Sequence, residues 1–168
     1  RGDTVLFHAA GDTGTRIVTA FDRRRRSEMP VTRPGFNSWN ARWSASGAWI
    51  AYTSDEGGRA EVYVQAWPTG TPRVRATFGG GQRPQWAGGD RLYFQRNDTV
   101  MRATVTGRTS PVVSTPQPVL TSNGLRDFAV TPSGDRFLVV TAAPGSVVGT
   151  AHLIIDWSAA VPPPPPTR

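Results

Sequence analysis

Residue types that perform covalent chemistry are scarce in this chain. The sequence has no cysteine, and all 19 of its basic residues are arginine, so lysine is absent as well. Without cysteine there is no thiol nucleophile and no cysteine-based zinc site. Without lysine there is no phosphate-binding lysine of a nucleotide-binding loop and no residue that forms a Schiff base. The Gly-x-Ser-x-Gly pattern of a hydrolase nucleophile turn is also missing.

The two histidines, His8 and His152, lie 144 residues apart in the sequence. A lone histidine in a strand-like segment more often has a structural role than a catalytic or metal-binding one. We therefore predict no catalytic residue, no metal site and no cofactor, and we predict that this segment is not an enzyme. A kinase or peptidase activity would belong to another part of a longer parent chain.

A run of four arginines, Arg23 to Arg26, could contact nucleic acid or acidic lipid. Asp22 and Glu28 lie beside the run and partly balance its charge. The formal net charge of +7 is not by itself a footprint for nucleic acid, because binding needs a basic stripe on one face. We favour a solvated loop and predict no nucleic-acid partner.

Three consecutive glycines, Gly79 to Gly81, could hold a phosphate through their backbone N–H groups. That arrangement requires a helix to follow the glycines, whereas the residues that follow here have the pattern of a strand. We favour a linking turn. Asn97, Asp98 and Thr99 match a glycosylation sequon, but Asn97 and Asp98 are also well suited to a two-residue hairpin turn.

A repeat determines the elements that position these residues. A glycine turn that leads into an apolar strand occurs four times, at offsets of 45, 42 and 45 residues. A period in the low forties that is built from short strands is typical of a β-propeller, with one four-stranded blade per repeat. The sequence therefore predicts an all-β fold without helices. The four copies occupy residues 2–7, 47–52, 89–94 and 134–139.

Apolar patterning places up to four strands in each repeat. First strands are expected at 41–44, 84–87 and 128–131, each with a bulky apolar residue before the glycine turn. Second strands are expected at 49–54, 91–96 and 136–141, third strands at 16–21, 61–67, 99–105 and 152–157, and weaker fourth strands at 73–78 and 117–121.

The alignment predicts a β-propeller fragment of nearly four blades with four-stranded antiparallel sheets. The first blade (1–34) and the closing blade (124–161) are incomplete, since the first lacks its first strand and the last lacks its outer strand. Complete blades are expected at 35–79 and 80–123, with the four arginines between the first and second blades. A proline-rich tail at 162–168 is predicted to be disordered. We interpret the chain as the closing end of a larger ring, whose remaining blades would be its partners.

Polar residues recur in one column of the alignment, where each first strand begins. Asn40, Arg83 and Asp127 occupy this column, and the next two columns are mostly small or apolar. The entrance of each first strand should lie near the mouth of the central channel of a propeller. We predict that these residues bind a protein partner or a small ligand, with Arg42 and Gln85 as second candidates. The alternative is that they only cap turns.

The repeats resemble those of TolB-like, WD-repeat-like β-propellers of bacteria. Residues 41–64 carry most of the resemblance, and residues 79–86, 131–139 and 153–160 continue it. The chain departs from the family at Ser46, where the family usually has an aspartate in the turn. The resemblance implies a scaffold for binding partners, without a catalytic set of propeller residues.

Such propellers occur attached to bacterial serine/threonine protein kinases and as free-standing TolB-like proteins. The resemblance thus implies a sensor or docking domain of a larger envelope protein, with a membrane-anchored serine/threonine kinase as the leading parent. A propeller that gates a prolyl-oligopeptidase-type serine peptidase and a TolB-like periplasmic docking protein are the alternatives. The segment contains no run of about 18 apolar residues, so we predict no membrane span in it. The expected location is extracytoplasmic, in the periplasm or at the cell surface of a bacterium with a GC-rich genome.

Overall fold

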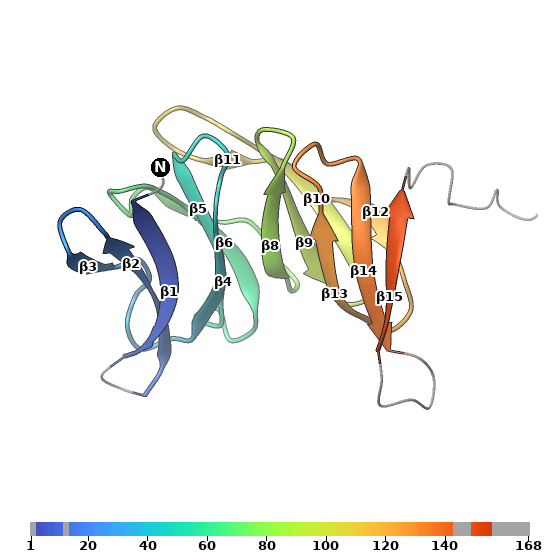
Figure 1. The fold of residues 1–168 in the computed structure, drawn as a ribbon, viewed down its shortest axis with the longest axis horizontal. Helices are drawn as coiled ribbons and strands as arrows, with labels where there is room; N and C mark the ends of the chain where they lie inside the picture. The colour runs from blue at the N-terminus through green and yellow to red at the C-terminus, as the bar shows by residue number, and fades with distance from the viewer. Residues whose placement is uncertain (1–2, 12–13, 143–148, 156–168) are drawn as a thin grey trace, which may run out of the picture.

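The chain forms a row of four antiparallel β-sheets. The computed structural model describes residues 3–11, 14–142 and 149–155. This part of the chain contains no helix, and so none that is long and apolar enough to cross a membrane. The sheets stand side by side, as Figure 1 shows, and follow one another in chain order. The prediction of an all-β propeller fragment with incomplete first and last blades is confirmed.

Each sheet is built from strands that are consecutive in the sequence. The first contains β1 (Thr4–Ala10), β2 (Arg16–Asp22) and β3 (Ser27–Pro30). The second contains β4 (Ser38–Trp43), β5 (Trp49–Ser54), β6 (Glu61–Ala66) and β7 (Arg73–Arg75). The third contains β8 (Gln82–Ala87), β9 (Arg91–Arg96), β10 (Thr99–Thr106), β11 (Val112–Val113) and β12 (Gln117–Thr121). The fourth contains β13 (Leu125–Val130), β14 (Arg136–Ala142) and β15 (Gly149–Ile155).

The strands differ from the predicted ones mainly at the edges of the sheets. The first strands β4, β8 and β13 begin two or three residues earlier than expected, and β7 ends at Arg75. β10 pairs with β12 along one half and with β11 along the other, so the outer strand of the third sheet is interrupted. Residues 156–168 lie outside the described residues, and with them the predicted tail.

The arginine run was placed wrongly between two blades. Arg23 to Arg26 form the tip of the hairpin that joins β2 to β3 within the first sheet. The strand β3 was not predicted, because all four of its residues are exposed and its sequence shows no apolar alternation. The arginines are exposed, as expected for a solvated loop.

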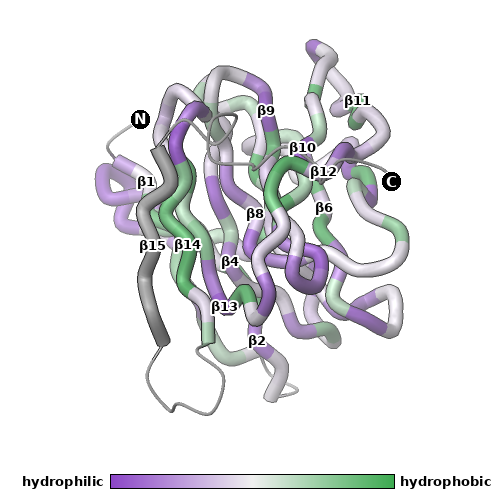
Figure 2. Tube along the Cα trace, turned by 90° about the vertical axis from the view of Figure 1, so that its right-hand side faces the viewer, coloured by the Kyte–Doolittle hydropathy of each residue, from purple (hydrophilic) through white to green (hydrophobic). Residues whose placement is uncertain are grey.

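Three cores lie between neighbouring sheets, and their composition explains the continuous apolar runs in the central strands. All six residues of β5 are buried. Its alternate residues enter opposite cores: Ile50 and Tyr52 pack toward the first sheet, whereas Trp49 and Ala51 pack toward the third. A strand that is covered on both faces has no polar side, which is why its sequence reads as apolar throughout. Figure 2 also shows a hydrophobic stretch along β14, where buried residues alternate with more exposed ones.

Side-chain hydrogen bonds also join neighbouring sheets. Gln65 of β6 donates from Nε2 to the carbonyl oxygen of Val31 over 2.9 Å. Trp86 of β8 donates from Nε1 to the carbonyl oxygen of Arg42 over 3.1 Å. Because these bonds are directional, they fix how each sheet is placed against the next one. The bond from Trp86 thereby joins β8 to β4. We call the first strands β4, β8 and β13 of the second, third and fourth sheets the inner strands.

Candidate binding site on the inner strands

All five residues predicted to bind a ligand line the same hollow. It has a volume of about 270 Å³ and lies across the inner strands, which contact one another in the order β4, β8, β13. Three further residues, Pro84, Phe128 and Ala129, complete the lining. The structure therefore brings together side chains that are more than 80 residues apart in the sequence. The lining residues predicted from the sequence are Asn40, Arg42, Arg83, Gln85 and Asp127.

A β-bulge in each inner strand shapes this hollow. The pairing of β4 with β5 shifts between Trp39 and Arg42, and that of β8 with β9 shifts between Gln82 and Gln85. Asn40 and Arg83 occupy the bulges with φ angles of 54° and 55°. Two residues of the predicted column, Asn40 and Arg83, therefore occupy bulges, whereas Asp127 pairs with Val140 directly after the shift in β13. None of the three is the first residue of its strand. Bulges re-aim side chains and are common beside functional sites.

Arg83 is held in a strained conformation by several contacts. A positive φ angle is unusual for arginine, and the following Pro84 disfavours helical backbone at the residue before it. The Arg83 side chain donates from Nη1 to Oε1 of Gln95 over 2.9 Å and to the carbonyl oxygen of Arg126. Its Nε lies 3.5 Å from Oδ1 of Asp127. These contacts orient one guanidinium and one carboxylate at the edge of the hollow.

Gln85 joins two sheets and is not available to a ligand. Its Nε2 donates to the carbonyl oxygen of Phe128, and its Oε1 accepts from the backbone N–H of Val130 over 3.2 Å. The carboxamide thus pairs with the free edge of β13 as a neighbouring strand would. The candidate role of Gln85 is therefore structural in this arrangement.

Arg42 and Asn40 are the groups in the hollow that remain open. Arg42 is exposed, and its side chain donates to the carbonyl oxygen of Ala41 over 3.0 Å. Within the described residues it has no acidic partner, and the Asn40 side chain has no hydrogen-bond partner. The lining carries the two cations Arg42 and Arg83 against the single carboxylate of Asp127. This excess of positive charge suits the binding of an acidic group.

The surroundings of His8 and of the glycine run can be described, whereas the side chain of His152 lies outside the described residues. Burial lowers the pKa of His8, and the charges of Arg16 and Arg42 lower it further. No group of metal-ligating residues occurs in the part of the chain that the structure describes. The backbone N–H groups of Gly79 and Gly80 do bind an anion, but it is the carboxylate of Glu61, 3.0 Å away from each. The backbone N–H groups of Gly79 and Gly80 are therefore already bonded to a side chain of the same chain.

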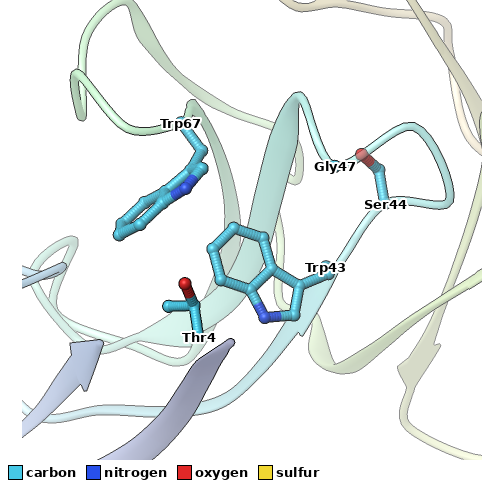
Figure 3. A pocket seen from close by; sticks show the side chains of 5 residues that line it. All are labelled: Thr4, Trp43, Ser44, Gly47 and Trp67. Atoms are coloured by element: carbon cyan, nitrogen blue, oxygen red, sulfur yellow. The ribbon is translucent and has the colours of Figure 1, made fainter. Parts of the chain in front are cut away.

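Sequence reasoning missed two features. Gln95 is buried in an apolar strand, and it binds Arg83 while its Nε2 donates to the carbonyl oxygen of Leu125 over 2.8 Å. The sequence around Gln95 does not distinguish it from the other residues of its strand. The second feature is a hollow of about 180 Å³ beside Trp43 and Trp67, drawn in Figure 3. The side chains of both tryptophans are only partly buried.

The fold and the shared hollow define a β-propeller fragment with a candidate binding site on its inner strands. The fold is that of TolB proteins. TolB from Acinetobacter baumannii superposes with a TM-score of 0.70 at 21% sequence identity, over 92% of this chain and 38% of that one. A putative TolB from Agrobacterium tumefaciens superposes with a TM-score of 0.73 at 17% identity, over 92% of this chain and 58% of that one. This chain thus corresponds to only part of each TolB chain. No protein-family model and no curated protein matches the sequence.

Proposed function

We propose that this chain is a non-catalytic propeller scaffold that binds a protein partner through the hollow on its inner strands. The observation that carries the proposal is that side chains from three sheets meet around one hollow in which Arg42 and Asn40 are open to a ligand. Arginine binds carboxylates through charge-assisted hydrogen bonds, and the lining has an excess of positive charge. The partner therefore presents an acidic side chain or a carboxyl terminus.

A titration with short peptides tests this function. The probe is an acetylated and amidated Gly-Glu-Gly-Glu-Gly peptide, and the control peptide has glutamine in place of glutamate. We expect the acidic peptide to bind more tightly, and Arg42→Ala to weaken its binding about tenfold. Arg108→Ala is the matched control, because Arg108 is an exposed arginine in the loop between β10 and β11. Equal effects of the two substitutions, or equal binding of the two peptides, would overturn the proposal.

The proposed setting is a larger bacterial envelope protein, in which the propeller acts as a sensor or docking domain outside the cytoplasm. This part of the proposal is supported by the resemblance of the repeats and by the TolB-like fold. Sequencing the gene upstream of Arg1 tests it. A kinase domain followed by a membrane span would support a kinase-linked sensor, and a signal peptide alone would support a docking protein. A hydrolase domain with a nucleophile turn would contradict both.

A further inference from the structure

A further hollow lies where the end of β1 meets the second sheet. It has a volume of about 300 Å³, and it is lined by residues of the β1–β2 hairpin and by Asn37, which directly precedes β4. Strand β1 contacts β4, and Figure 1 shows the two strands beside one another. We call this space the His8 hollow. Its lining residues are His8, Ala9, Ala10, Gly14, Thr15, Arg16 and Asn37.

Two basic side chains in this lining are open to a ligand. His8 and Arg16 are exposed, and within the described part of the chain neither side chain makes a hydrogen bond or an ion pair. They come from neighbouring strands, because β1 and β2 pair along their whole length. The lining contains no aspartate or glutamate. A hollow with free basic donors and no carboxylate of its own suits an anion.

An acidic residue next to this lining, Asp55, has its carboxylate bonded to Asn37. Oδ1 of Asp55 accepts from the backbone N–H of Asn37, and Oδ2 accepts from Asn37 Nδ2, both over 2.8 Å. Oδ1 of Asn37 in turn accepts from the backbone N–H of Arg16 over 3.1 Å. These bonds fix the backbone of Arg16 against the second sheet and leave its guanidinium without an acidic partner among the described residues.

Arg42 links the His8 hollow to the inner-strand hollow. It lines the inner-strand hollow from β4, and its charge also acts on the imidazole of His8. Burial lowers the pKa of His8 most, and the charges of Arg16 and Arg42 lower it further. Such charge effects weaken beyond about 10 Å, so both guanidinium groups lie near the imidazole. With a pKa below its ordinary value, His8 is mostly neutral at neutral pH in the free protein.

We propose that the His8 hollow is a second subsite for the acidic partner, where His8 takes up a proton from solvent as a carboxylate of that partner binds beside it. This inference rests on the proposed function, because the partner that binds Arg42 is the one that reaches His8. A carboxylate beside the imidazole favours its charged form. Binding should therefore strengthen as the pH falls from about 7.5 to about 5.5, a range in which glutamate side chains stay ionised.

Calorimetric titration of the full chain with the acetylated and amidated Gly-Glu-Gly-Glu-Gly peptide tests the subsite. We expect binding about threefold tighter at about pH 5.5 than at about pH 7.5, with a binding heat that depends on the ionisation enthalpy of the buffer because a proton is taken up. His8→Gln keeps a polar side chain that cannot titrate, so it should abolish both effects. Arg16→Gln should weaken binding about threefold at both pH values.

The matched control is His152→Gln, because His152 belongs to β15 in the fourth sheet, at the other end of the row in Figure 1. It should leave the pH dependence unchanged. A second measurement uses the unaltered chain: in NMR spectra the ring protons of His8 should titrate at a higher pH when the peptide is bound, and those of His152 should not shift.

The outcomes separate this subsite from the proposed function. Peptide binding that fails at both pH values, or that Arg42→Ala leaves unchanged, would overturn the proposed function and the subsite together. Binding that depends on Arg42 but is equally tight at both pH values would overturn the subsite alone. The same holds if the pH dependence survives in His8→Gln, or if the titration of the His8 ring does not respond to the peptide.

Discussion

Arg75 donates a hydrogen bond from Nη2 to Oε1 of Glu61 across 2.7 Å. The Glu61 side chain has no exposed surface, although it begins a strand beside an exposed hairpin. Thr77 and the backbone N–H groups of Gly79 and Gly80 also donate to the same carboxylate. A single buried charge thus holds the segment that links the second sheet to the third.

Replacing Glu61 with glutamine should destabilise the fold. A glutamine side chain has one acceptor oxygen and one donor group, so at least one of the buried donors around it loses its partner. We expect the free energy of unfolding, measured in urea, to fall by about 2–4 kcal/mol. The control is Glu28→Gln in the exposed strand β3, which should change it by less than about 0.5 kcal/mol. Similar losses for the two variants would contradict this account.

The same carboxylate should make stability depend on pH. Burial by itself raises the pKa of Glu61, but hydrogen bonds from Thr77, Gly80 and Arg75 outweigh burial and lower the pKa below its ordinary value of 4.5. The unfolded chain therefore takes up a proton at this residue before the folded chain does. The contribution of Glu61 is complete above the unfolded pKa and disappears as the pH falls through the folded pKa. Urea unfolding at about pH 6, 4 and 3 should show a steeper loss for the unaltered chain than for Glu61→Gln.

Arg73 should not tolerate replacement by lysine. Its guanidinium binds both oxygens of Glu56, at 2.9 and 2.5 Å, and donates to the Tyr52 hydroxyl over 3.0 Å. It also lies 4.7 Å from the centre of the Tyr63 ring. Lysine cannot make the two-pronged contact, so Arg73→Lys should lower the free energy of unfolding by about 1–2 kcal/mol.

The control for Arg73→Lys is Arg102→Lys in β10. Arg102 is also partly buried, but its side chain has no hydrogen bond or ion pair within the described part of the chain. That substitution should cost less than about 0.5 kcal/mol in the same urea experiment. If both lysine variants behave alike, the network around Arg73 is not stabilising.

The bulge at Asn40 should accept glycine but reject valine. The φ angle of 54° at this position is one that asparagine and glycine adopt readily and that β-branched residues avoid. We expect Asn40→Gly to change the free energy of unfolding, measured in urea, by less than about 0.5 kcal/mol. Asn40→Val should lower it by about 1–3 kcal/mol. Ala129→Val, at an exposed position of the inner strand β13, should be neutral. A harmless valine at position 40 would argue against the bulge.

The central strands were predictable because both of their faces are buried. β5 and β9 lie where the repeat placed them, since each glycine turn leads directly into a run of apolar residues that must enter two cores. Exposed edge strands carry no such signal. For that reason β3 and β11 were not predicted, and the arginine run was assigned to the wrong connection.

The residues around the inner-strand hollow were also predictable, because equivalent positions in a repeat occupy equivalent places in each blade. The roles of these residues could not be predicted from the sequence. Gln85 and Arg83 are held by backbone groups of the next sheet, about 43 residues further along the chain, whereas Arg42 and Asn40 remain open. No local pattern distinguishes the first pair from the second, because the partners are distant in the sequence.

Periodicity alone therefore specifies the fold class, the number of repeats and the column of polar residues, since these depend on local turns and on alternation of apolar side chains. The packing of one sheet against the next decides everything that involves two sheets. It brings the Gln85 carboxamide against the backbone of β13, and it forms the hollow between the first and second sheets beside Trp43 and Trp67. These contacts depend on the distance and angle between sheets, which are properties of the assembled core and of no single segment.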